Sequence, residues 1–222
     1  MNKILGEGEY FDTIIFDLDG VVIDSAQDLA GAVQHTLKFL NCETRDYEYI
    51  RNSIGGGARN ILLKCLSEDK KRLIDEAMRH FREYYKENCA NKTVLYPGVA
   101  EVLEYYSGKK NIALATFKIR SATVRILKKL NVLQYFDVII TADDVEKPKP
   151  DPQCIEKILE KLNCQTKKVI LIGDTANDLL TGKNAGIKTC AVLYGIGTED
   201  EIRKHNPNYI IKNIMELKRI IL

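Results

Sequence analysis

Short apolar segments alternate with helical stretches through the second half of this chain. The candidate strands are residues 112–115, 138–140, 169–172, 189–193 and 209–211. Strict alternation of strand and helix favours parallel strands joined by right-handed crossovers. The pattern therefore predicts an α/β fold built on a doubly wound parallel sheet.

An earlier apolar run, residues 13–16, fits a short strand buried on both faces of the same sheet. Between it and the next strand, residues 26–91 show helical periodicity and contain no proline. Ser25 and Asp28 resemble a capping box at the start of this block, and residues 68–89 fit a second long helix. We therefore expect an α/β core, residues 1–22 and 93–222, with an inserted all-helical domain, residues 23–92.

The composition is that of an ordinary globular protein, with 45% hydrophobic and 29% charged residues among 222. The net charge of +2 favours neither nucleic acid nor a membrane as the main partner. Residues 1–9 lack the apolar region of a signal peptide, and no segment is apolar enough to span a membrane, so we expect a cytoplasmic protein. The six cysteines form no C-x-x-C pair, which favours reduced thiols over disulfides or zinc.

Two carboxylates, Asp17 and Asp19, directly follow the first predicted strand. Side chains two residues apart in an extended segment point the same way, so the pair can face one site. Carboxylates held this close repel each other unless a cation offsets their charge, and Mg²⁺ prefers oxygen ligands. An ordinary Asp-Gly turn is the alternative, whereas the apolar residues 21–23 exclude a calcium-binding EF-hand loop.

Polar residues also follow the later strands, and in an open parallel sheet ligands bind beyond the carboxyl ends of the strands. Each has an ordinary alternative as a helix cap, a helix start or a turn. Their joint occurrence predicts one site at one sheet edge. The residues are Thr116, Phe117 and Lys118 after the second core strand, Lys147 or its competitor Lys149 after the third, and Asp174 and Asp178 after the fourth.

Four motifs occur in the order found in the haloacid dehalogenase superfamily of phosphatases, which this chain resembles along essentially its whole length. They are D-x-D-G-x-x-x-D-S at 17–25, a threonine at 116, K-P-x-P-D-P at 147–152 and G-D-x-x-x-D at 173–178. The resemblance implies a Rossmann-like catalytic core with a helical cap domain inserted after the first motif. It also implies a Mg²⁺-dependent phosphoric monoester hydrolase.

The resemblance assigns roles to the matching acids. Asp17 would be the nucleophile that forms an aspartyl phosphate, and Asp19 the general acid and base. Asp17, the backbone carbonyl of Asp19 and Asp174 would hold Mg²⁺, with Asp178 behind them or acting through a water molecule.

The remaining motif residues would bind the phosphoryl group. Thr116 and the backbone amide of Phe117, followed by Lys118, would contact its oxygens, and Lys147 would offset negative charge. Phe117 departs from the asparagine that is frequent at this position in related phosphatases.

Within the superfamily the chain is most similar to the phosphoglycolate phosphatase-like group, on the segment from Arg51 to Gly57. Arg51 or Arg59 would pair with a substrate carboxylate while the amides of Gly55 and Gly56 approach it. The alternative is a flexible helix connection with two solvated arginines.

This resemblance makes 2-phosphoglycolate the favoured substrate. The alternatives are pyrophosphate, a nucleotide, a sugar phosphate, or the reaction of a beta-phosphoglucomutase. A phosphoacceptor receiver or a non-catalytic binding protein is disfavoured by the helical insert and by the filled motif positions. We expect a small phosphorylated metabolite as partner and a monomer or homodimer.

Overall fold

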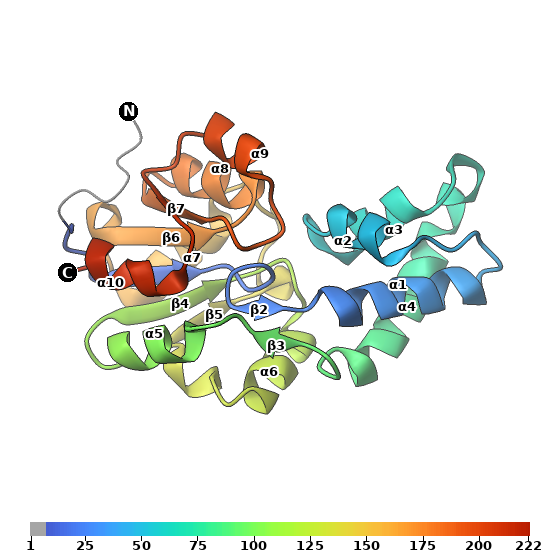
Figure 1. Ribbon diagram of the computed structural model, residues 1–222, viewed down its shortest axis with the longest axis horizontal. Coiled ribbons are helices and arrows are strands. Elements are labelled where there is room, and N and C mark those ends of the chain that lie inside the picture. The colour runs from blue at the N-terminus through green and yellow to red at the C-terminus, as the bar shows by residue number, and fades with distance from the viewer. Residues whose placement is uncertain (1–7) are drawn as a thin grey trace.

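The structure is a computed structural model that describes residues 8–222. Residues 1–7 lie outside the described residues. They belong to the predicted core segment 1–22 and to the segment 1–9 that was compared with a signal peptide. Figure 1 shows a sheet covered by helices, with the helices of residues 26–88 gathered to one side of it.

The central sheet has six parallel strands in the order β5-β4-β1-β6-β7-β8. The predicted α/β fold with a doubly wound, Rossmann-like sheet is confirmed, and each predicted strand is present with its bounds correct to within one residue. The strands are β1 (Thr13–Phe16), β4 (Asn111–Ala115), β5 (Val138–Ile140), β6 (Val169–Gly173), β7 (Lys188–Val192) and β8 (Tyr209–Ile211).

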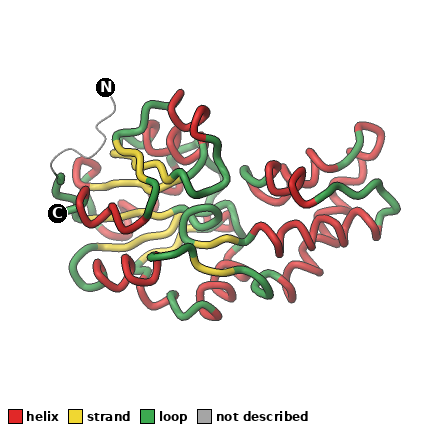
Figure 2. Tube along the Cα trace, in the orientation of Figure 1, coloured by secondary structure: helices red, strands yellow, loops and turns green. Residues whose placement is uncertain are grey.

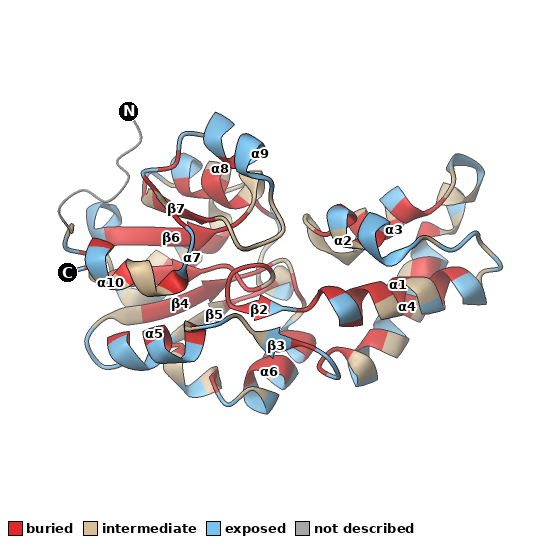
Figure 3. Ribbon diagram, in the orientation of Figure 1, coloured by how far each residue is buried: buried red, intermediate tan, exposed pale blue. Residues whose placement is uncertain are grey.

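Both faces of the sheet are buried, which explains why its strands are apolar without alternation. Ile15 and Leu171 face one side and pack with Ile155 and Ile158 of α7. Ile14, Phe16 and their neighbours face the other side, in the core formed with α5, α6 and α10. Figure 2 shows the strands with helices around them, and Figure 3 shows that the strands of the sheet are largely buried. The helices of the core are α5 (Val99–Tyr106), α6 (Arg120–Lys129), α7 (Gln153–Leu162), α8 (Ala176–Asn184), α9 (Glu199–Lys204) and α10 (Leu217–Ile220).

The predicted helical insert contains four α-helices, and α1 packs antiparallel to the chain's later α4 in Figure 1. The predicted helix over 68–89 is interrupted, because residues Glu68–Leu73 form a 3₁₀ helix and α4 begins only at Ile74. The sequence pattern also missed two short helices on either side of the glycine turn. The four helices are α1 (Ala26–Phe39), α2 (Tyr47–Ser53), α3 (Gly57–Cys65) and α4 (Ile74–Asn88).

The two chain crossings between core and insert are paired with each other. β2 (Ile23–Asp24) and β3 (Val94–Leu95) form a two-stranded antiparallel sheet that the sequence analysis did not predict. The predicted boundaries at 22/23 and 92/93 fall at this pair of strands, and we propose that the parts on either side of it are separate domains.

Asp28, in the first turn of α1, fastens the second crossing to the first. Its carboxylate accepts hydrogen bonds from the amides of Lys92 (2.9 Å) and Thr93 (2.8 Å) and from Thr93 Oγ1 (2.7 Å). The predicted capping box is therefore wrong, because Asp28 is occupied here and the Ser25 hydroxyl makes no cap hydrogen bond. None of the helices in residues 8–222 is long and apolar enough to cross a membrane.

Replacing Asp28 with alanine should destabilise the protein, because three buried or partly buried donors would lose their acceptor. We expect the free energy of unfolding in urea to fall by about 3 kcal/mol. The exposed Asp200 provides the control, and Asp200→Ala should change it by less than about 0.5 kcal/mol. Equal effects of the two substitutions would contradict a fastening role for Asp28.

Candidate active site

The candidate site lies at the carboxyl ends of β1, β4, β5 and β6. Because β1 pairs with both β4 and β6, the residues that follow these strands meet although they are far apart in sequence. Asp17 follows β1, Thr116 follows β4 and Asp174 follows β6, while Asp178 lies in the first turn of α8.

Asp17 is buried and forms an ion pair with a buried lysine, Lys149. Lys149 Nζ donates to Asp17 Oδ1 at 2.8 Å and to Asp178 Oδ1 at 2.7 Å. Burial alone would lower the pKa of Lys149, but the charges of Asp17 and Asp178 raise it above its ordinary value, so Lys149 stays charged. The site therefore contains a fixed ammonium group beside the first acid.

Lys149, and not the predicted Lys147, occupies this position. Lys147 is exposed, and its backbone amide, like that of Glu146, donates to the side chain of Gln153 at the start of α7. This attachment turns the 147 side chain out to solvent and directs the residue two positions later into the site. The assignment by proline spacing chose the wrong lysine of the two.

Three acids, Asp17, Asp174 and Asp178, bring carboxylate oxygens within 4.8 Å of one another. Burial raises the pKa of Asp17 to about 7. Burial also raises the pKa of Asp174, and the negative charges of Asp178 and Asp17 raise it further. One lysine charge cannot offset three carboxylates, so the cluster favours a bound cation.

Asp174 carries the clearest sign of a missing partner. Its Oδ2 accepts the Ile196 amide at 2.7 Å, while its buried Oδ1 has no hydrogen-bond partner among the described residues. A buried carboxylate oxygen left unpaired is costly, and a hard metal ion satisfies it. The donor set, all oxygen, therefore fits such an ion.

Glycines close over Asp174 on two sides. A Cβ atom at Gly20 or Gly195 would collide with the Asp174 carboxylate, and Gly20 also has a φ of +92°. Only glycine allows both close approach and this backbone conformation. The motif glycine after Asp19 thus makes room for the acid from β6.

Asp178 is more heavily bonded than the other two acids. Its Oδ2 accepts from the amide and hydroxyl of Thr175, in a capping box at the start of α8, while Oδ1 faces Lys149. This bonding agrees with the expectation that Asp178 supports a cation from behind.

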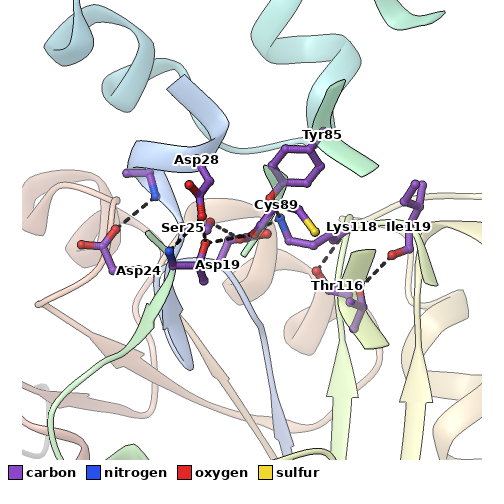
Figure 4. Close-up of polar contacts among 12 residues, drawn as sticks. Asp19, Asp24, Ser25, Asp28, Tyr85, Cys89, Thr116, Lys118 and Ile119 are labelled. Carbon is purple, nitrogen blue, oxygen red and sulfur yellow. Dashed lines mark hydrogen bonds and ion pairs between the residues drawn. The ribbon is translucent and has the colours of Figure 1, made fainter. Parts of the chain in front are cut away.

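The carboxylate of Asp19 turns away from the acid cluster. Figure 4 shows it among Ser25, which donates a short hydrogen bond to it, and Lys118, whose Nζ lies 3.1 Å from Asp19 Oδ1. Lys118 also donates to the hydroxyl of Tyr85 at 2.7 Å. Tyr85 belongs to α4, so one side chain of the insert reaches a lysine of the core that holds Asp19.

Lys118 therefore forms an ion pair with Asp19 in the structure, although it was expected to bind phosphate. Burial alone would lower its pKa, but Asp19 and Tyr85 raise it, so it remains charged. On α4, Tyr85 is buried, whereas its neighbour Tyr84 stacks on His35 with ring centroids 4.1 Å apart. Only the i, i+4 spacing from Phe81 to Tyr85 could have suggested this residue.

A cavity of about 260 Å³ connects these groups to the insert. Asp17, Asp19, Thr116 and Asp178 line its polar end, and Phe117 lies beside them. Thr116 is buried, and its Oγ1 accepts the Lys118 amide at 3.1 Å. These groups can surround a small anion between the sheet edge and the four helices.

The glycine turn of the insert reaches this cavity, and of the two predicted arginines Arg59 lines it while Arg51 does not. Gly55 and Gly56 line the cavity, together with Arg59, which is paired with Asp75 at 2.6 Å. Arg51 lies in α2 and is absent from the lining. The expectation that Arg51 contacts a ligand is therefore wrong for this arrangement, because α2 carries it away from the cavity.

Comparison with known proteins identifies a matching family and several similar proteins. Residues 14–192 match the family model of haloacid dehalogenase-like hydrolases. A phosphoglycolate phosphatase of Aquifex aeolicus is 39% identical over 82% of this chain and 84% of its own length. The pyrophosphatase PpaX of Halalkalibacterium halodurans is 33% identical over 95% and 96%.

Solved structures agree with the sequence relatives. A haloacid dehalogenase-like family hydrolase from Streptococcus pneumoniae superposes with a TM-score of 0.85 at 29% identity, covering 94% of this chain and 97% of that one. The match extends over both the sheet and the inserted helices. The chain belongs to the haloacid dehalogenase-like hydrolases.

Proposed function

We propose that this protein is a Mg²⁺-dependent phosphatase that hydrolyses a small phosphomonoester through an aspartyl phosphate on Asp17. The observation that carries the proposal is the buried Asp17 held 2.8 Å from Lys149, at the open end of the sheet and on the wall of the cavity. Family membership and the phosphatase names of the relatives support it.

In the first step an oxygen of Asp17 attacks phosphorus, and the bond between phosphorus and the leaving oxygen breaks. Asp19 gives its proton to that leaving oxygen. In the second step Asp19 takes a proton from water as the water oxygen attacks phosphorus, which releases inorganic phosphate and restores the Asp17 carboxylate. Ser25 and Lys118 keep Asp19 in place for both transfers.

Lys149 offsets negative charge on the nucleophile and on the group being transferred, with Thr116 and the Phe117 amide beside the same oxygens. Asp17 and Asp174, with Asp178 behind them, would hold Mg²⁺. When bound, Mg²⁺ supplies charge neutralisation at the phosphoryl oxygens. Its charge would also counter the raised pKa of Asp17, which burial causes and to which the charge of Asp178 adds.

The relatives suggest two substrates. One relative is named a phosphoglycolate phosphatase and another a pyrophosphatase, so 2-phosphoglycolate is the first candidate and pyrophosphate the second. Release of inorganic phosphate with Mg²⁺ measures both reactions.

Asp17→Asn should abolish turnover, because an amide cannot form the acyl phosphate. Steady-state release of phosphate measures this, with Asp200→Asn, an exposed change of the same kind, as the control. Turnover by Asp17→Asn at a rate near that of the control would rule out the nucleophile assignment.

Substitutions of the two lysines of the third motif should have clearly different effects on kcat. Lys149→Ala removes a buried charge that faces Asp17, so we expect kcat to fall about a hundredfold or more. Lys147→Ala removes an exposed side chain and should leave kcat nearly unchanged. Thermal unfolding of both variants shows whether Lys149→Ala is folded, and the opposite ranking in a folded pair would restore Lys147 as the functional residue.

Mg²⁺ should stabilise the folded protein, since it binds the acid cluster only after folding brings Asp17, Asp174 and Asp178 together. At about 100 times the dissociation constant we expect about 2.7 kcal/mol of added stability, visible as a rise in Tm. Asp174→Asn should lose most of this rise, while NaCl at equal ionic strength gives the background. The same Mg²⁺-dependent rise in wild type and variant would contradict the proposed metal site.

A further inference from the structure

The walls of the cavity are apolar, although its inner end is charged. The side chains come from the core and from three helices of the insert, and they surround the space just beyond Thr116 and Asp17. The apolar wall includes Leu29, Ile54, Ile61, Met78, Phe81 and Phe117.

Phe117 brings the two halves of this wall together. Its Cβ lies 3.7 Å from the position that a Cβ of Gly57 would occupy, so the glycine turn of the insert packs close to the base of the Phe117 side chain. Lys149 Nζ lies 5.5 Å from the centroid of the Phe117 ring. A group attached to a phosphoryl at Asp17 therefore meets the Phe117 ring first.

Lys118 and Arg59, which line the cavity, and Lys149, which pairs with Asp17 next to it, are each held by a carboxylate, so these three cations offer no free place for a second anionic group of a substrate. Lys118 faces Asp19 and the Tyr85 hydroxyl, and Lys149 faces Asp17 and Asp178. Arg59 pairs with Asp75. The remaining lining cations, Arg82 and Lys86, are exposed at the mouth.

The volume exceeds what the smallest phosphate esters need. An apolar cavity of about 150 Å³ accommodates benzene. The 260 Å³ here therefore holds one ring together with a phosphoryl group. A two-carbon acid ester would leave much of the apolar wall without contact and would bring its carboxylate against hydrocarbon, which is unfavourable.

We propose that the preferred substrate is a phosphomonoester whose alcohol carries an apolar body about the size of one ring. The body packs between Phe117 and the helices of the insert, where Met78 of α4 also lines the cavity. This inference rests on the phosphatase function proposed above. It keeps that reaction but replaces 2-phosphoglycolate, the candidate taken from the relatives, with an ester of an apolar alcohol as the preferred substrate.

Benzyl phosphate, ethyl phosphate and 2-phosphoglycolate test the proposal, because all three are esters of primary alcohols and differ mainly in what the alcohol carries. We expect kcat/KM for benzyl phosphate, with Mg²⁺, to exceed that for each of the other two by about tenfold or more. Phosphate release is the readout for all three.

A matched pair of methionine variants locates the preference. Met78→Gln makes the wall polar at nearly constant volume, so the ratio of kcat/KM for benzyl over ethyl phosphate should fall by about threefold or more. Met215→Gln is the same change in the 3₁₀ turn Ile214–Glu216, outside the cavity, and should leave the ratio unchanged.

The outcomes are distinct. A higher kcat/KM for 2-phosphoglycolate or ethyl phosphate than for benzyl phosphate overturns the inference but leaves the phosphatase function standing. An equal fall of the ratio in the Met78 and Met215 variants also overturns it. Absence of phosphate release from every ester, with a folded wild-type protein and Mg²⁺, overturns the phosphatase function and the inference together.

Discussion

Buried charge at the end of a parallel sheet is the constraint on which the site depends. Asp17, Asp174 and Asp178 converge there because β1 lies between β4 and β6. Within the described residues the Lys149 ammonium group pairs with two of them, Asp17 and Asp178. Carboxylates removed from water are tolerated only when cations offset them. The unpaired Asp174 oxygen and the raised pKa of Asp17 indicate that Lys149 alone does not complete this balance.

The insert contributes to the site by contact as well as by enclosure. Tyr85 of α4 accepts a hydrogen bond from Lys118, which in turn holds Asp19, while the glycine turn approaches Phe117. Asp28 and the β2–β3 pair fasten both crossings of the chain between core and insert. The position of the four helices is thus connected to the group proposed to move protons, and three of these helices supply the apolar wall that we propose selects the alcohol.

Much of the fold was predictable because a doubly wound sheet leaves a strong local pattern. Strands buried on both faces are short, apolar runs, and their limits were correct to within one residue. The β2–β3 pair was missed because two residues carry too little pattern, and α2 and α3 were missed because they are short and flank a glycine turn. The 3₁₀ segment before α4 was missed because its charged residues fit a helix of either kind.

The sequence by itself determined which chemical groups lie at the strand ends, because the motif residues directly follow the apolar strands. The alternation of strand and helix makes these strands parallel, so their carboxyl ends lie at one edge of the sheet. Only the tertiary structure decided which of two nearby lysines enters the site, because the Gln153 contact that turns Lys147 outward involves a different element. It also separated Arg51 from the cavity and brought Tyr85 to Lys118. These features depend on how elements distant in the chain pack together, and the spacing of residues within one segment does not reveal that packing.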